Sequence, residues 1–176
     1  MDKLNIKDEL LIENSKSQAT KLVKYIGCDE NKFKELLNLF LGDNYLIIQR
    51  SAWVLSYDVI NYPYLIKPYY EELIKLLEED VHDAVKRNIF RLLQYVEIPK
   101  KWESKILDIC FSTIVNRKEA VAIRAFAITV AHRICKLYPE LLAELKIILK
   151  DNLDLEKPAF VSRARRVLNN KFPKNI

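Results

Sequence analysis

Four arginines recur along the chain at almost constant spacing, and this periodicity constrains the fold more than any other feature. They are Arg50, Arg87, Arg124 and Arg163, separated by 37, 37 and 39 residues. Each lies early in a segment whose apolar residues have helical spacing, such as Ile123-Arg124-Ala125-Phe126. A fixed period of this length is typical of repeat proteins in which each repeat is one supersecondary unit.

A second helical segment precedes each arginine segment. Its apolar residues lie at i, i+3 and i+4, as in Leu73, Leu76 and Leu77. These first helices are predicted over residues 33–41, 65–77, 102–114 and 141–149. Each repeat is therefore a first helix, a short turn and a second helix carrying the arginine. The predicted repeat boundaries are 32–62, 63–98, 99–138 and 139–172.

Residues 1–31 precede the first full repeat and are predicted to form an N-terminal helical cap. Asp2 to Asn14 and Ser17 to Ile26 each have a helical pattern, and Gly27 closes the second of them. A cap presents a polar outer face and shields the apolar face of the first repeat. The prediction is an all-α chain, organised as a single domain of a cap followed by the repeat region 32–176.

Turn residues agree with this division. Gly42 follows a first helix, where we expect a residue with positive φ. Prolines follow second helices or begin first helices at positions 63, 99 and 139, where a missing N–H is tolerated. Short polar residues between the two helices of each repeat are predicted to cap the second helix, namely Asp43, Asp80, Asn116 and Asp151.

The two-helix unit resembles a HEAT repeat, which is an armadillo-type fold. An aliphatic-basic pair opens the second helix in Val85-Lys86 and Ile123-Arg124, whereas Ile48-Gln49 and Val161-Ser162 depart from that pattern. The resemblance covers about residues 32–170. It implies an α-α superhelix, a right-handed solenoid of about four repeats whose second helices line a concave face. The chain is also similar to short uncharacterised bacterial HEAT-repeat proteins, and that similarity implies no activity.

Amino-acid composition limits the possible fold classes and the cellular location of the protein. Two glycines in 176 residues are too few for strand-and-turn folds or phosphate-cradling loops. No apolar run is long enough for a membrane span, so no membrane association is expected. The three cysteines, at positions 28, 110 and 135, lie among apolar neighbours and are predicted to be buried thiols. With no signal-peptide pattern, these features predict a cytoplasmic protein.

The sequence contains no recognised catalytic, metal-binding or nucleotide-binding motif. The only histidines, His82 and His132, lie 50 residues apart, and no metal-binding or nucleotide-binding motif occurs. We predict no cofactor, no metal and no catalytic residue. Some HEAT-like proteins are DNA glycosylases for alkylated purines, which use aromatic and acidic residues. Through that resemblance, two pairs could serve such an activity: Trp53 with Asp58, and Trp102 with Glu103.

The candidate binding residues are arginines of the second helices. They are Arg50, Arg87, Arg91, Arg124, Arg133, Arg163, Arg165 and Arg166. Guanidinium groups bind phosphate and carboxylate bidentately. Two interpretations of the periodic arginines remain open: a structural ladder paired with turn carboxylates such as Asp83, Glu119 and Asp154, or a surface that faces a ligand.

Charge is divided unevenly between the halves. Residues 1–88 carry 12 Lys/Arg and 15 Asp/Glu, for a net charge of −3, whereas residues 89–176 carry 17 and 9, for +8. The leading hypothesis is a non-enzymatic scaffold that holds a protein partner on its concave face. The alternative is nucleic-acid binding by a basic stripe of the C-terminal half. The pattern specifies no oligomeric state.

Overall fold

The computed structural model describes residues 4–171, and all regular structure in that range is helical. No strand occurs among these residues, which confirms the predicted all-α class. The chain divides into two compact units, Met1–Val96 and Glu97–Ile176. Their boundary lies within two residues of the predicted boundary between the second and third repeats.

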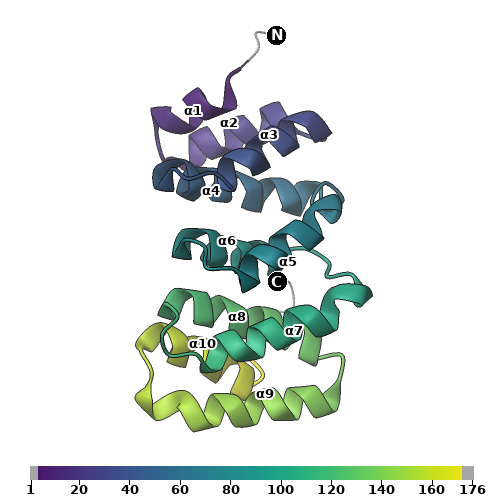
Figure 1. Cartoon of the computed structure of the whole chain (residues 1–176), viewed down its shortest axis with the longest axis vertical. Coiled ribbons are helices and arrows are strands. Elements are labelled where there is room, and N and C mark those ends of the chain that lie inside the picture. Colours follow the sequence, from purple (N-terminus) through teal and green to yellow (C-terminus); the bar gives the residue numbers. More distant parts are fainter. Residues whose placement is uncertain (1–3, 172–176) are drawn as a thin grey trace. The chain divides into compact units, whose positions relative to one another are not determined.

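Six α-helices lie among the described residues of the first unit, and Figure 1 shows their order along the chain. They are α1 (Ile6–Ile12), α2 (Lys16–Ile26), α3 (Glu30–Phe40), α4 (Tyr45–Asn61), α5 (Tyr70–Glu78) and α6 (Asp83–Leu93), with a 3₁₀ turn at Lys67–Tyr69. Helix α4 is central, because it packs against α1, α2, α3 and α6. Its burial on several sides explains a nearly continuous run of buried residues from Ser51 to Val59.

The second unit contains four α-helices in its described part, residues 97–171. They are α7 (Lys100–Val115), α8 (Val121–Cys135), α9 (Pro139–Asn152) and α10 (Pro158–Leu168), with a 3₁₀ turn at Leu153–Leu155. Helix α8 is central here, packing against α7, α9 and α10. Small buried side chains, Ala125, Ala127 and Ala131, allow these close contacts around α8.

One pair of helices lies within each of the predicted repeat ranges. Helices α1 and α2 occupy the predicted cap, and the later helices form the pairs α3–α4, α5–α6, α7–α8 and α9–α10. Prolines begin α9 and α10 at their first position, and Pro99 directly precedes α7. Gly27 closes α2 as predicted, and it does so with φ +54°, which glycine adopts without strain.

Two predictions about helix ends are wrong. Gly42 does not have positive φ, although it directly follows Leu41, the C-cap of α3, whose φ is −87°. The side chains that cap α4 and α6 belong to Asn44 and His82, and no side chain caps α8 or α10. An N-cap must directly precede the first helical residue. The predicted residues Asp43, Asp80, Asn116 and Asp151 lie too early; Asn116 instead ends α7.

The cysteines differ from one another. Cys110 and Cys135 are buried as predicted, and burial raises the pKa of the Cys135 thiol to about 12. The prediction for Cys28 is wrong, because this residue follows Gly27 in the turn before α3 and is exposed. A turn at a helix end faces solvent even when apolar residues flank it in sequence.

Two features are absent from residues 4–171. No helix there has the length and apolar character required to cross a membrane. No group of three or more histidine, cysteine or acidic side chains is placed to hold a metal ion in that same range.

Candidate functional site

The eight candidate arginines all lie on or at the ends of second helices. Arg50 is on α4, Arg87 and Arg91 are on α6, Arg124 and Arg133 are on α8, and Arg163, Arg165 and Arg166 are on α10. They fall into two groups, three in the first unit and five in the second.

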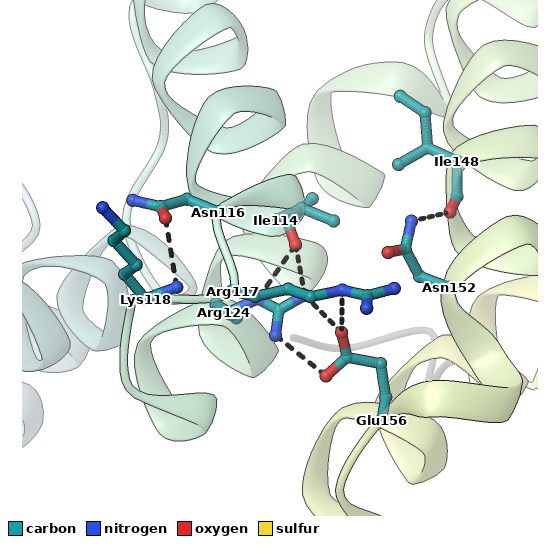
Figure 2. A network of polar contacts seen from close by, with 8 residues as sticks. All are labelled: Ile114, Asn116, Arg117, Lys118, Arg124, Ile148, Asn152 and Glu156. Carbon is teal, nitrogen blue, oxygen red and sulfur yellow. Dashed lines mark hydrogen bonds and ion pairs between the residues drawn. The ribbon is translucent and has the colours of Figure 1, made fainter.

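Arg124 is the most buried of these arginines, with 3% of its surface exposed. Its Nε and Nη2 donate to the carbonyl oxygen of Ile114 at 2.9 and 2.7 Å (Figure 2). Ile114 lies in the last turn of α7, where backbone carbonyls have no partner inside the helix. The guanidinium thus caps the C-terminus of the preceding helix, and its charge is also favourable at that end.

The same guanidinium binds Glu156 with bidentate geometry. Nη1 donates to Oε2 at 2.8 Å and Nη2 donates to Oε1 at 2.6 Å. The ring of Phe160 packs against the other side of Arg124, with its centroid 4.7 Å from Cζ. Because these contacts occupy Nε and both terminal nitrogens, Arg124 forms part of the interior of the second unit.

Arg117 adds a weaker contact to this network. Its Nε lies 3.8 Å from Glu156 Oε1, and 54% of its side chain is exposed, compared with 4% for Glu156. Solvent screens such a pair much more than the buried one. The structure therefore assigns the dominant compensation of the Glu156 charge to Arg124.

Arg50 has a related role in the first unit. It is half-buried, and Nη1 donates to the carbonyl oxygen of Leu10 at 2.7 Å. Leu10 lies in the last turn of α1, so Arg50 also caps a helix C-terminus. The network is less complete than around Arg124, because Arg50 Nε is buried without a hydrogen-bond partner.

Arg87 and Arg91 lie one turn apart on α6 and share a face. Both side chains are half-buried, and the adjacent Asn88 is buried with its amide donating to the Ala84 carbonyl at 2.8 Å. Neither guanidinium has a hydrogen bond or ion pair to another described residue. Among the candidates in the first unit, these two are the more accessible to a ligand.

Arg165 and Arg166 are the most exposed candidates. They line an open recess of about 480 Å³ beside Pro158, Val161 and Ser162 on α10, with Glu156 at its edge. Arg163 and Arg133 are half-buried, and each already makes a contact within the protein. The second unit thus combines a buried structural arginine with an exposed basic pair.

Asp58 is a buried acid that sequence analysis considered only as one member of an aromatic-acidic pair. Its exposed fraction is 0%, and neither carboxylate oxygen has a hydrogen-bond partner. Burial raises the pKa of this carboxyl to about 7. A carboxylate in this environment is costly unless it is protonated.

The two aromatic-acidic pairs do not form joint sites, because Asp58 is buried and Trp102 does not line the recess that contains Glu103. Trp53 and Asp58 are five residues apart on α4, about 140° around the helix, and Asp58 is fully buried. Trp53 instead packs near Tyr57, with ring centroids 6.4 Å apart. In the second pair, Glu103 accepts a hydrogen bond from the Tyr138 hydroxyl at 2.7 Å.

Glu156 and Phe160 complete the Arg124 site, and sequence analysis singled out neither of them. The prediction named Asp83, Glu119 and Asp154 as turn carboxylates for the arginines, whereas Arg124 binds Glu156, two residues beyond Asp154. Glu156 follows the 3₁₀ turn that ends the α9 region and directly precedes Lys157 and α10. Its position depends on that turn, for which the helical periodicity carries no signal.

The chain was compared with known proteins. A family model described as a HEAT repeat domain matches residues 6–171. No curated protein and no solved structure matches significantly. The matched range covers nearly the whole chain and includes every helix described above. The chain therefore belongs to the HEAT repeat domain family.

Proposed function

We propose that this protein is a non-enzymatic binding module that holds a segment of a protein partner on the second-helix face of its first unit, where α4 packs against α6. HEAT repeats generally serve as protein-interaction scaffolds, and the chain belongs to that family. The observation that carries the proposal is the burial of Arg124 against Ile114 and Glu156. This arginine stabilises the repeat itself, so it adds nothing to a basic stripe that would bind phosphates.

The accessible part of this face in the first unit includes Arg87 and Arg91. A guanidinium pair one turn apart suits a partner carboxylate or backbone carbonyl. Their half-buried side chains also have aliphatic portions that pack against apolar partner groups. Arginine is enriched at the residues that dominate binding energy in protein interfaces.

The test is capture of partners by the full chain from native lysate, with quantitative identification of the bound proteins. The variant Arg87→Glu/Arg91→Glu reverses the charge of the face. A matched control, Lys34→Glu/Lys67→Glu, makes the same charge change at exposed positions of the same unit. We expect one protein bound stoichiometrically by wild type and control, and lost by the face variant.

Recovery of no stoichiometric protein would contradict the proposal. Equal recovery by the face variant and the control would also contradict it, because the second-helix face of the first unit would then not be the binding surface. Circular dichroism melts of both variants establish that the loss does not reflect unfolding.

A second candidate function, nucleic-acid binding, is favoured by the exposed pair Arg165 and Arg166. Residues 97–176 carry 16 Lys/Arg and 9 Asp/Glu, for a net charge of +7. Exposed arginines on a cationic unit attract phosphate backbones through counterion release. We expect fluorescence anisotropy to detect binding of labelled duplex DNA or single-stranded RNA at about 50 mM salt, falling steeply as salt rises.

The variant Arg165→Ala/Arg166→Ala should weaken this binding. Lys7→Ala/Lys24→Ala removes the same charge from exposed positions of the first unit and serves as the control. Undetectable binding of both nucleic acids at about 50 mM salt would exclude the candidate.

A further inference from the structure

A groove lies between α7 and α9 in the second unit, and neither proposed function uses it. Its floor is apolar and is formed by Leu107 and Phe111 of α7, Ile134 of α8 and Leu141 of α9. The cavity volume is about 380 Å³, which lies within the range of pockets that bind small molecules or anchor side chains. Leu107 and Phe111 lie one helical turn apart, so they present one continuous apolar stripe.

Carboxylates dominate the rim of this groove. Glu103 and Asp108 project from α7, and Glu144 projects from α9, with Lys100 as the basic residue among the lining groups. Asp108 and Glu144 are exposed, and Glu103 is half-buried. The local formal charge of this lining is therefore −2.

Glu103 is held in a fixed position. Its Oε2 accepts a hydrogen bond from the Tyr138 hydroxyl at 2.7 Å, and this bond raises the pKa of Tyr138. The hydroxyl occupies one of about four acceptor positions on the carboxylate, which leaves others for a donor from outside. A carboxylate that is already ordered loses little entropy when it binds a cation.

The net charge of the groove lining is negative, whereas the net charge of the unit around it is positive. Residues 97–176 have a net charge of +7, so anionic partners are drawn to the other surfaces of the unit. An apolar floor does not suit a phosphate backbone, and an acidic rim repels one. The complementary ligand is cationic next to an apolar group.

A second recess extends the groove. It has a volume of about 280 Å³ and shares Glu103 and Ile134 with the first recess. Leu137, which is 61% exposed, lies on its edge, together with Glu97. This second recess also contains Arg133 and Lys136, so its lining is neutral, and Glu103 belongs to both recesses.

We propose that this groove binds a peptide segment of a partner protein in which a Leu or Phe side chain lies beside one or two Lys or Arg residues. The apolar side chain enters the floor between Leu107, Phe111 and Leu141. The basic side chains bind the fixed carboxylate of Glu103 and the exposed carboxylates of Asp108 and Glu144. First helices line most of this surface, so it is separate from the second-helix face of the proposed function, and either can fail alone.

The experiment uses fluorescein-labelled peptides of one design and the full chain. In the test peptides, a Leu or Phe lies between two Lys or Arg residues in an alanine-serine background. One control peptide has Glu in place of each basic residue, and another has Ala in place of the apolar residue. We expect anisotropy titrations to give at least about tenfold tighter binding of the test peptides than of either control.

Charge reversal in the protein locates the binding. Asp108→Lys/Glu144→Lys should weaken the test peptide by about tenfold or more and improve binding of the Glu peptide. The matched control, Asp151→Lys/Asp154→Lys, makes the same charge change at exposed positions outside the groove. Its effect should stay within about twofold, because only long-range electrostatics change.

Absence of any preference for the test peptides would overturn the proposal, and so would equal weakening by the two double variants. Light scattering measures the oligomeric state, and so tests whether a second copy of this chain occupies the groove. We expect a monomer at the concentrations that bind peptide. The proposal would be overturned if the protein formed a dimer that the Asp108→Lys/Glu144→Lys variant dissociates but the test peptides do not.

Discussion

The two units differ in whether their buried charged side chains are paired with one another. In the second unit, the buried guanidinium of Arg124 and the buried carboxylate of Glu156 bind one another bidentately. In the first unit, α4 carries both a buried acid, Asp58, and a half-buried arginine, Arg50, but the two have no contact. Eight residues separate them on α4, which is about 12 Å along the helix.

The difference shows that burial of charge in this fold requires pairing between elements. Glu156 reaches Arg124 because the turn before α10 brings it beside the end of α7 (Figure 2). Asp58 has no such partner, so its carboxyl is accommodated by a raised pKa. Variants of these buried charged residues, and of the exposed Arg117, test this difference between the two units.

The largest expected effect comes from Glu156→Ala. This change leaves the Arg124 charge buried with no carboxylate, and we expect a loss of about 3–5 kcal/mol in the free energy of unfolding. Urea denaturation measures it, and the buried thiols of Cys110 and Cys135 should react faster with a thiol reagent. The double variant Arg124→Leu/Glu156→Leu removes both charges and should be destabilised by less than the single variant. A double variant as unstable as the single one would contradict this account of the pair.

Asp58→Asn should stabilise the protein, with a gain that grows with pH. The folded-state pKa is raised from 3.8 to about 7, so the folded protein binds a proton that the unfolded chain releases between these values. Stability of the wild type contributed by this group is therefore present below about pH 4 and lost as pH rises to about 7. At pH 8 the variant should be more stable by about 2–4 kcal/mol.

Melting curves from pH 5 to pH 8 test the Asp58 prediction, with the exposed Asp154→Asn as a control. A difference between Asp58→Asn and wild type that does not change with pH would show that the Asp58 carboxyl is not protonated in the folded protein near neutral pH.

Arg50→Met has a smaller expected effect than Glu156→Ala. The Leu10 carbonyl loses its charged donor, but the variant also removes the buried, unpaired Nε. A charge-assisted hydrogen bond contributes about 1.5–3 kcal/mol, and removal of the unpaired group offsets part of that. We expect a net loss of about 1 kcal/mol in urea denaturation. A loss equal to that of Glu156→Ala would mean that Arg50 stabilises the first unit through contacts other than the α1 cap.

Arg117→Ala has the smallest expected effect. Its contact with Glu156 is 3.8 Å long and its side chain is more than half exposed, so we expect a loss below about 1 kcal/mol. The loss should diminish further in high salt, whereas that of Glu156→Ala should not. Equal salt dependence for the two variants would indicate that Glu156 is more hydrated than its burial implies.

Sequence periodicity was sufficient to predict the helix pairs but not the contacts between them. The 3.6-residue pattern gave the order and pairing of the helices, because each must bury one apolar stripe. The N-caps His82 and Asn44 differ from the predicted residues by one or two positions, since several short polar residues occur in each turn. The exposure of Cys28 depends on the turn after Gly27 and not on its apolar neighbours.

The candidate site was less predictable. The arginine period identified Arg124 as special, but both its structural role and a ligand-binding role agreed with the sequence. The choice depends on Glu156, which is 32 residues away and is positioned by a 3₁₀ turn. The α7–α9 groove likewise depends on which stripe of each helix remains uncovered after packing. That stripe is set by the crossing of the helices and not by their separate patterns.

Arg124 also limits how freely this array can be shortened. Repeat proteins are often treated as modular, with each unit removable in turn. Here one side chain of α8 joins the end of α7, the residue that leads into α10 and the ring of Phe160 within α10. Deleting the last helix pair would remove Glu156 and Phe160 from Arg124 and expose its guanidinium, so the third and fourth repeats form one structural block.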